Sequence, residues 1–252
     1  MTISSQQNKK LKEIRKLRQR RRWRERSGLF VAEGEDLLVA ADAAGWEAVE
    51  RYAAAGSGLP GVEVEAEALA SASGLASGTR ALAVYEERWI GAPAGPVCVY
   101  LHGLADPGNV GTILRSAQAF GVSTVAFGPG TADPFSPKAV RASMGAVFSV
   151  PLAKADAVAE LPGKKIALIP GEGVPLRELW PDPDAQRPDH ASVHLAVDIT
   201  LLIGAEREGL PPEIVDGADL IAHIPIATES LNAAMAASIA LYELTTRMAR
   251  DE

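Results

Sequence analysis

Short apolar runs alternate with helical stretches from residue 97 to the end of the chain. Strands are predicted at 97–101, 124–127, 147–150, 165–169, 193–203 and 220–224, and helices at 109–120, 137–143, 153–160, 212–217 and from about Asn232 onward. Strands that alternate with helices usually pair in parallel and are covered by helices on both faces. This pattern therefore predicts an α/β fold with a parallel sheet.

The first third of the chain predicts a smaller α/β unit. A basic helix at 9–26 is followed by predicted strands at 28–32, 48–52, 62–64 and 81–85 and by a helix at 36–44. Between 86 and 96 the sequence loses its periodicity and becomes rich in Pro and Gly, which is typical of a linker. We therefore expect two domains, at 1–90 and 97–252, with a polar, proline-rich connector at 181–190 inside the second.

Cysteine, histidine and hydropathy patterns limit the class of protein. The one cysteine, Cys98, lies in an apolar run, which predicts a buried, inert thiol and a reducing compartment. No apolar run approaches the roughly 18 residues that span a bilayer, and the first thirty residues lack the apolar core of a signal peptide. The four histidines lack the spacing of metal ligands, so no metal is expected. These features favour the cytoplasm and exclude a membrane-spanning protein.

The charge of the chain is strongly asymmetric. Residues 9–26 hold eleven basic side chains against two acidic ones, so this stretch is +9, although the whole chain is −7 and the remainder is therefore −16. Lys and Arg displace counterions from a phosphate backbone, and Trp23 could stack on a base, so the stretch predicts an RNA partner. The candidate contacts are Lys9, Lys12, Arg15, Arg18, Arg20, Arg21, Arg22, Trp23 and Arg24. The alternative is a solvated basic helix that docks through Leu11, Ile14 and Leu17, with Trp23 covering apolar surface.

Three polar and glycine-rich segments follow or end predicted strands: L-A-D-P-G-N-V-G-T-I-L-R at 104–115, I-G-A-E-R-E-G-L at 203–210 and I-P-I-A-T-E-S-L-N at 224–232. A fourth, V-R-A-S-M-G at 140–145, lies between the first two along the chain. Ligands of open α/β sheets bind at the carboxyl ends of the strands, where these segments are expected. Taken singly, each has an ordinary explanation: Asn109 and Asn232 could cap helices, Arg115 could be solvated, and a lone G-x-E-x-x-G is weak evidence.

In combination, the segments resemble the SpoU class of RNA ribose 2'-O-methyltransferases, the TrmH family of the SPOUT superfamily. The resemblance is carried by N-x-G-x-x-x-R at Asn109 to Arg115, G-x-E-x-x-G at Gly204 to Gly209, and S-L-N at Ser230 to Asn232. The basic helix and F-V-A-E-G at 30–34 resemble the substrate-binding domain, of ribosomal-protein L30e type, that precedes the catalytic domain in many members. Ala205 and Ala233 depart from the residues usual at their positions.

The resemblance implies a parallel sheet with a deep trefoil knot in which S-adenosylmethionine (SAM) binds. By position, the cofactor-binding residues would be Ile203, Gly204, Glu206, Gly209, Ile224, Ile226, Leu231 and Ala233. It also implies a homodimer, in which Ala233, Ala234, Ala236, Ala237 and Ala240 of the final helix would allow close approach. The implied catalytic residues are Asn109, Arg115, Glu206, Ser230 and Asn232, and Arg115 and Arg141 would contact the RNA. Among their roles, we favour Arg115 as a phosphate anchor, since a guanidinium stays protonated.

The resemblance thus predicts methyl transfer from SAM to a ribose 2'-hydroxyl in structured RNA, without a metal. Ribosomal RNA is favoured over transfer RNA because of the L30e-like domain. One alternative is an RNA-binding protein of the same fold that does not catalyse. A dinucleotide-binding enzyme is a further alternative, but it rests only on G-P-G at 128–130 and G-E-G at 171–173, neither of which is a phosphate-binding fingerprint.

Overall fold

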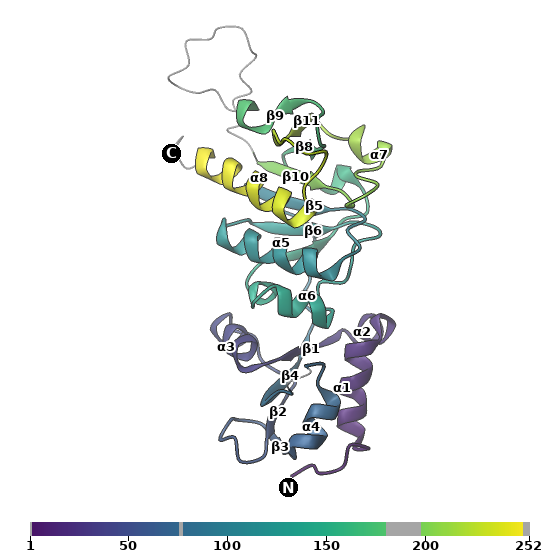
Figure 1. Cartoon of the computed structure of the whole chain (residues 1–252), viewed down its shortest axis with the longest axis vertical. Coiled ribbons are helices and arrows are strands. Elements are labelled where there is room, and N and C mark those ends of the chain that lie inside the picture. The colour runs from purple at the N-terminus through teal and green to yellow at the C-terminus, as the bar shows by residue number, and fades with distance from the viewer. Residues whose placement is uncertain (1, 76–77, 180–197, 249–252) are drawn as a thin grey trace. The chain divides into compact units, whose positions relative to one another are not determined.

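The computed structural model describes residues 2–75, 78–179 and 198–248, which form two compact units. The first unit contains the chain up to Arg88 together with Asp133–Ser149, and the second contains Trp89–Ala132 and the chain from Val150 onward (Figure 1). Within the described ranges, no helix is long and apolar enough to cross a membrane. The predicted connector at 181–190 and the beginning of the predicted strand at 193–203 lie outside the described residues.

The first unit is built on a four-stranded mixed sheet in the order β1-β4-β2-β3, in which only β2 and β3 pair in parallel. Its elements are α1 (Lys9–Gln19), α2 (Arg21–Ser27), β1 (Leu29–Glu33), α3 (Glu35–Ala43), β2 (Glu50–Ala54), β3 (Val62–Val64), α4 (Ala66–Ala72), β4 (Ala81–Glu86), α6 (Pro137–Ala142) and the 3-10 turn η1 (Ala146–Phe148). The predicted small α/β unit is confirmed, with α4 as an additional helix.

The basic stretch forms two helices, where the sequence predicts one. The backbone of Arg20 between them is extended, at φ −126° and ψ 107°. A side chain of α2 stabilises this bend: the Arg24 guanidinium donates a hydrogen bond to the carbonyl of Leu17, in α1, at 2.6 Å. Leu11, Ile14 and Leu17 are buried in the core of the unit, so the predicted docking face of α1 is confirmed.

An aromatic cluster explains why Asp133–Ser149 packs with the first unit. Phe135 packs against Phe30 with the rings tilted and 4.7 Å between their centroids, and Phe148 meets Trp46 edge-on at 5.1 Å. The Trp46 indole N–H also donates to the carbonyl of Phe148 at 2.8 Å. Large aromatic rings contribute much of the buried apolar area of a core. The compact unit therefore includes a segment that the sequence division places in the second domain.

The stretch from 146 to 160 differs from its predicted structure. A strand at 147–150 and a helix at 153–160 are expected, but the chain forms η1, then strand β7 (Leu152–Lys154) and the short turn η2 (Val158–Glu160). Gly145 starts the change with φ 95°, in the left-handed region that favours glycine. Since Phe148 is taken into the aromatic cluster, the apolar run cannot continue as a strand at that point. These two element predictions are wrong because tertiary contacts override the local pattern.

The second unit contains a seven-stranded, all-parallel sheet in the order β7-β6-β5-β10-β8-β11-β9, which confirms the predicted sheet. Its remaining elements are β5 (Val97–Leu101), α5 (Pro107–Ala119), β6 (Thr124–Phe127), β8 (Lys164–Leu168), β9 (Val174–Pro175), η3 (Leu176–Leu179), β10 (Ile199–Ile203), α7 (Pro212–Val215), β11 (Leu220–His223) and α8 (Ala233–Met248). The deep trefoil knot stays a prediction.

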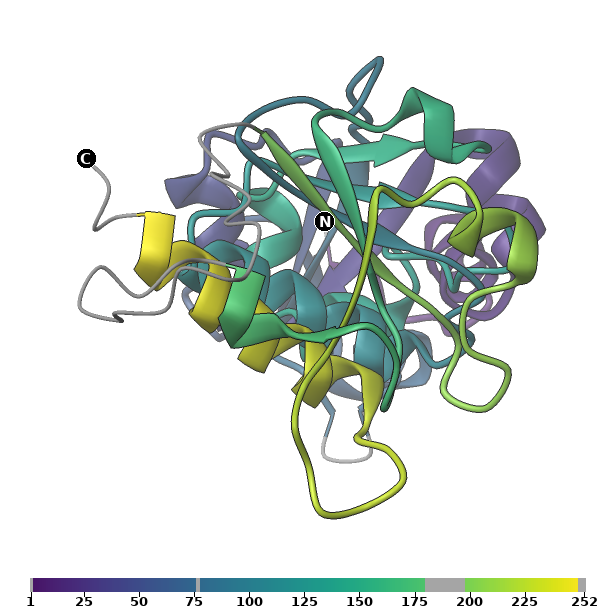
Figure 2. The ribbon, with the colours of Figure 1, turned by 90° about the horizontal axis from the view of Figure 1, so that it is seen from above.

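Helices lie on both sides of this sheet. Figure 2 shows α5 and α8 together on one side and α7 on the other. The hydroxyls of Ser116 on α5 and Ser238 on α8 are 2.6 Å apart, which joins the two helices. Four of the five alanines expected to face a second subunit, Ala233, Ala234, Ala237 and Ala240, are buried within this chain, and Ala236 is partly exposed. Small side chains thus allow α8 to pack closely inside its own unit.

Candidate active site

The three sequence motifs lie on loops at the carboxyl ends of parallel strands. The first motif follows β5, the second follows β10, and the third lies between β11 and α8. Because β5 and β10 are neighbours in register, the loops that follow them emerge side by side. The order of strands therefore gathers residues that are about 100 positions apart in the sequence.

A chain of hydrogen bonds connects one residue from each motif. The Asn109 side chain donates through Nδ2 to the Glu206 carboxylate, and the Asn232 side chain donates through Nδ2 to Asn109 Oδ1 at 3.1 Å. A carboxylate only accepts, so Asn109 must turn its amide nitrogen to Glu206 and its oxygen to Asn232. The carboxylate thus fixes the orientation of both amides.

Asn232 also begins the last helix. Its Oδ1 accepts from the backbone N–H groups of Ala234 at 3.0 Å and Met235 at 3.2 Å, which is the geometry of an N-cap. Asn109, by contrast, is no cap: α5 begins at Pro107, and Asp106 accepts from the Gly108 N–H at 2.9 Å. The expectation that Asn109 caps or begins α5 is wrong, and its side chain is available for the bonds across the site.

A cavity of about 360 Å³ lies beside this network. It is lined by 168–170, 203–209, Ile224, Ile226, 229–231, Ala233 and Ala236. All eight residues that the resemblance implies for cofactor binding are among them, together with Ser230. The walls combine apolar side chains with three carboxylates and one guanidinium, of Glu206, Glu208, Glu229 and Arg207. Such a lining suits a ligand with apolar parts and a net positive charge.

The second motif is a closed loop. Ala205 and Gly209 exchange two backbone hydrogen bonds, each of 3.1 Å. A Cβ on Gly204 would lie 2.3 Å from the backbone carbon of Gly209, so only glycine allows the two ends of the loop to approach. The closed loop directs Glu206 toward Asn109.

Sequence reasoning missed one wall of the cavity, at Leu168, Ile169 and Pro170. Leu168 is the last residue of β8, the other two follow it, and β8 pairs with β10 in the sheet. The sequence held part of the signal for this wall. A strand is predicted there, and the loops that follow the strands of a parallel sheet all lie at its carboxyl edge. The strand order that makes β8 the neighbour of β10 is not visible in the sequence.

Arg115 and Ser230 are held less firmly. Arg115 is exposed on α5, and among the described residues it makes no ion pair or hydrogen bond. Ser230 is exposed at the cavity, and its carbonyl accepts from the Thr228 hydroxyl at 3.3 Å. The structure therefore joins Asn109, Glu206 and Asn232 directly, whereas Arg115 stands apart from their network.

Within the described ranges, neither Cys98 nor any cluster of possible metal ligands forms a second reactive site. Cys98 is buried, and burial raises the pKa of its thiol to about 12, which confirms the prediction of an inert thiol. Burial also lowers the pKa of His102, which lies at the end of β5. In the described ranges, no group of three or more His, Cys, Asp or Glu residues could hold a metal ion.

The basic helices are only partly available to an anionic partner. Lys9, Lys12, Arg20, Arg21 and Arg22 are exposed, although Arg21 pairs with Glu25 at 2.8 Å. Trp23 is half-buried beneath the Lys16 ammonium, which lies 4.4 Å from the ring centroid. On α6, Arg141 has a buried Nη1 without a hydrogen-bond partner in the described part of the chain.

Three of the predicted RNA-binding arginines are bound to the protein itself. Arg24 is 4% exposed and pairs with Asp133, at 2.7 Å between Nη2 and Oδ2. Arg18 pairs with the buried carboxylate of Glu33 and donates to a backbone carbonyl of α4. Arg15 donates to the carbonyl of Gln6 at 2.7 Å. Arg18 and Arg24 are therefore held within the protein, since moving either side chain away would leave a largely shielded carboxylate without its ion pair. Their assignment to RNA binding stays a prediction.

Replacing Asn232 by alanine removes both the helix cap and the bond to Asn109. We expect the free energy of unfolding to fall by about 1–2 kcal/mol, measured by urea denaturation, because a lost N-cap typically costs about 1 kcal/mol. Asn232→Asp is the matched control: it keeps the cap acceptor but cannot donate to Asn109. Equal stability of Asn232→Ala and the wild type would contradict the capping role.

Comparison with known proteins matches both parts of the chain. Residues 96–242 match the SpoU rRNA Methylase family, and residues 8–87 match the MRM3-like substrate binding domain. An AdoMet-bound rRNA methyltransferase from Sinorhizobium meliloti has a similar structure, with a TM-score of 0.82 and 29% identity over 98% of each chain.

Two curated relatives each match more than half of the chain. An uncharacterized tRNA/rRNA methyltransferase from Mycobacterium tuberculosis is 38% identical over 58% of this chain and 50% of its own length. The 23S rRNA (guanosine(2553)-2'-O)-methyltransferase of Bacillus subtilis is 30% identical over 55% of this chain and 54% of its own. The chain thus spans about half the length of these relatives. Because the family model covers more than half of the chain, this protein belongs to the SpoU rRNA methylase family.

Proposed function

We propose that this protein transfers a methyl group from SAM to the 2'-hydroxyl of a ribose in ribosomal RNA. The observation that carries the proposal is the hydrogen-bonded set of Asn109, Glu206 and Asn232 beside a cavity whose lining contains every implied cofactor-binding residue. The relative from Bacillus subtilis, a 2'-O-methyltransferase of 23S rRNA, and the AdoMet-bound structure from Sinorhizobium meliloti support the substrate and the methyl donor.

The cavity fits the proposed donor in shape and charge. Gly204 allows the two ends of the second motif to close into a loop, and that loop forms one wall of the cavity. Ile224 and Ile226 supply apolar walls, and the carboxylates of Glu206 and Glu229 suit a cationic ligand. When bound, SAM would supply a methyl group on a positively charged sulfur. The ribose oxygen would take up this methyl group and lose its proton, and S-adenosylhomocysteine would leave.

The residues of the chain would orient the hydroxyl and its phosphate. Asn109 is fixed by Glu206, so its amide is preorganised and does not need to reorient during the reaction. Ser230, on the cavity wall, would line the space beside the methyl group. Arg115, exposed on the same helix as Asn109, would hold the phosphate next to the reacting ribose.

Calorimetry with SAM and transfer of labelled methyl groups to purified ribosomal RNA test the proposal together. We expect SAM to bind once per chain, and the label to be recovered in a 2'-O-methylated nucleoside. Binding of ribosomal RNA without SAM binding or transfer would favour the alternative, an RNA-binding protein that does not catalyse. Methylation of transfer RNA, with none of ribosomal RNA, would show that transfer RNA is the substrate. The cytoplasmic location stays a prediction.

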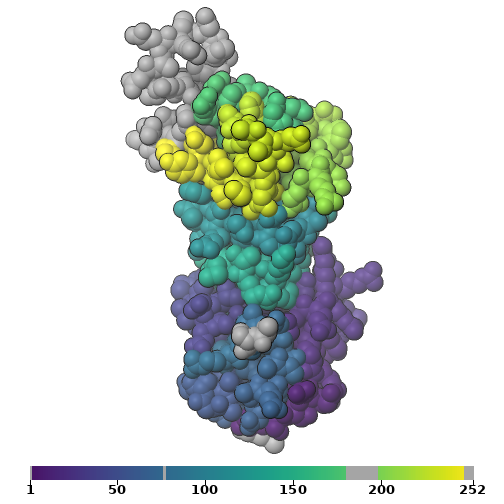
Figure 3. Space-filling model, viewed as in Figure 1, coloured from purple at the N-terminus to yellow at the C-terminus, as the bar shows by residue number. Residues whose placement is uncertain are grey.

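We further propose that two copies associate through the outer face of α8. Met235, Ile239 and Tyr242 recur at helical spacing and are exposed, and the helix lies on the surface of the second unit in Figure 3. An exposed apolar stripe is typical of an interface. We expect light scattering to give the mass of a dimer, and Tyr242→Asp to give a monomer that still folds. A monomeric wild-type protein would contradict this proposal.

A further inference from the structure

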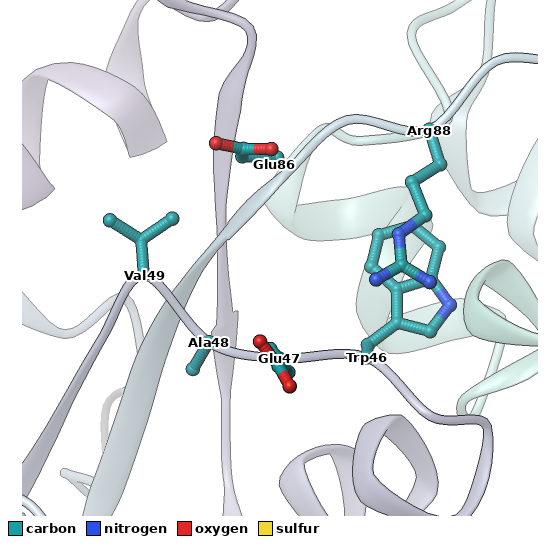
Figure 4. A pocket seen from close by; sticks show the side chains of 6 residues that line it. All are labelled: Trp46, Glu47, Ala48, Val49, Glu86 and Arg88. Carbon is teal, nitrogen blue, oxygen red and sulfur yellow. The ribbon is translucent and has the colours of Figure 1, made fainter.

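A second hollow, in the first unit, is not used by the proposed reaction. It has a volume of about 370 Å³ and is lined by Trp46, Glu47, Ala48, Val49, Glu86 and Arg88 (Figure 4). All six residues lie between the end of α3 and the residues that follow β4. None of them belongs to the basic helices or to the three motifs.

The floor of the hollow is a fixed aromatic ring. Trp46 is 7% exposed, donates its indole N–H to the carbonyl of Phe148, and meets Phe30 edge-on at 6.0 Å between centroids. These contacts hold the ring in one orientation. The Arg88 guanidinium lies over it, with Cζ 4.2 Å from the ring centroid, and the Arg88 residue is exposed. A planar guanidinium that is stacked on one face can accept a second planar group on its other face.

The remaining polar groups are carboxylates without partners. Glu47 and Glu86 are exposed, and within the described residues neither makes an ion pair or a side-chain hydrogen bond. Val49 adds an apolar side chain that is 55% exposed. The hollow therefore combines a stacking surface, hydrogen-bond acceptors and an apolar edge.

This combination selects against most classes of ligand. A phosphate would be attracted by the guanidinium but repelled by two carboxylates, and a cationic side chain would be attracted by the carboxylates but repelled by the guanidinium. A neutral planar molecule that stacks on Arg88 and donates hydrogen bonds avoids both penalties. RNA bases that are unpaired stack on Arg guanidinium planes and expose their Watson–Crick edges.

We propose that this hollow binds an unpaired guanine base of the RNA substrate. Guanine carries two adjacent N–H donors, at N1 and N2, which match the two oxygens of one carboxylate. In adenine and cytosine, a ring nitrogen that accepts hydrogen bonds lies next to the amino group. In uracil, two carbonyls flank the N–H. Each of these bases would therefore place a hydrogen-bond acceptor beside a carboxylate oxygen, which repels it. The inference rests on the proposed function because RNA is the polymer that supplies the base.

The test uses the whole protein and dye-labelled five-nucleotide RNAs that differ only at the central base. We expect the RNA with central guanine to bind more tightly than those with inosine, which lacks the N2 amino group, or adenine. Arg88→Ala should weaken binding of the guanine RNA roughly tenfold, because loss of a stacking partner for a base costs about 1–3 kcal/mol. Arg80→Ala, an exposed arginine of the same unit outside the hollow, is the matched control and should bind as the wild type does.

A second variant keeps the stacked pair and tests the carboxylates. In the double variant Glu47→Gln and Glu86→Gln, we expect the preference for guanine over inosine to be lost. Equal binding of all three RNAs by the wild type, or an Arg88→Ala effect of the same size on each RNA, would overturn the proposal. SAM binding, measured on the same samples, should be unchanged in all variants. A wild-type protein that does not bind SAM would contradict the proposed function. The guanine-binding proposal would still be decided by the RNA measurements.

Discussion

Arg115→Ala is expected to lower the rate of methyl transfer at least 100-fold and to leave SAM binding unchanged. Arg115 does not line the cavity and makes no contact that stabilises the described fold, so its loss should cost little stability. Its expected task is to place the ribose, and a misplacement of about 1 Å can cost 100-fold in rate. Single-turnover transfer of labelled methyl groups at saturating SAM, with calorimetry for SAM affinity, measures the two effects separately.

Two further variants define the role of this side chain. Gln118→Ala, at another exposed position of α5, is the control and should transfer methyl groups at the wild-type rate. Arg115→Lys keeps the positive charge and should retain part of the activity if the residue anchors a phosphate. Full activity of Arg115→Ala on ribosomal RNA would refute the assigned role.

Arg24→Met is expected to lower the free energy of unfolding by about 3 kcal/mol, because it removes the ion pair of a nearly buried carboxylate, Asp133, which then keeps the hydrogen bond from the Phe135 N–H. It also removes the bond that closes the bend between α1 and α2. Arg22→Met, on the exposed side of α2, should change stability by less than about 0.5 kcal/mol. Urea denaturation compares the two variants, and equal stability would contradict the structural role of Arg24.

The variant at the exposed position, Arg22→Met, also tests the basic surface. Arg22 is free to contact a phosphate, so Arg22→Met should weaken RNA binding and reduce the slope of log affinity against log salt by about one. An unchanged slope would remove Arg22 from the RNA-binding surface. Arg24 cannot be tested in this way, since its loss would perturb the fold.

The candidate site was largely predictable from the sequence because its residues follow apolar strands. Carboxyl ends of parallel strands share one edge of a sheet, so Gly204, Gly209 and Asn232 could be expected to line one site. The bonds from Asn109 to Glu206 and Asn232 could not be predicted. They depend on the strand order that places β10 beside β5, and sequence periodicity carries no information about that order.

The errors share a physical cause, since composition does not reveal which side chains a fold buries. The charge run predicts RNA contacts, yet Arg18 pairs with the buried carboxylate of Glu33 and Arg24 pairs with Asp133, which is distant in the sequence. The alanines of α8 were expected to allow close approach of a second subunit. In the structure, they allow close packing against α5 of the same chain. Likewise, the apolar residues around Phe148 fit a strand as well as the aromatic cluster that they join.

The most direct test of the account is a map of 2'-O-methylated positions across total RNA from cells with and without the gene. The account predicts that one ribosomal RNA position loses its 2'-O-methyl group when the gene is removed, and regains it when the wild-type gene, but not Arg115→Ala, is restored. An unchanged map in cells shown to express the protein before deletion would contradict it.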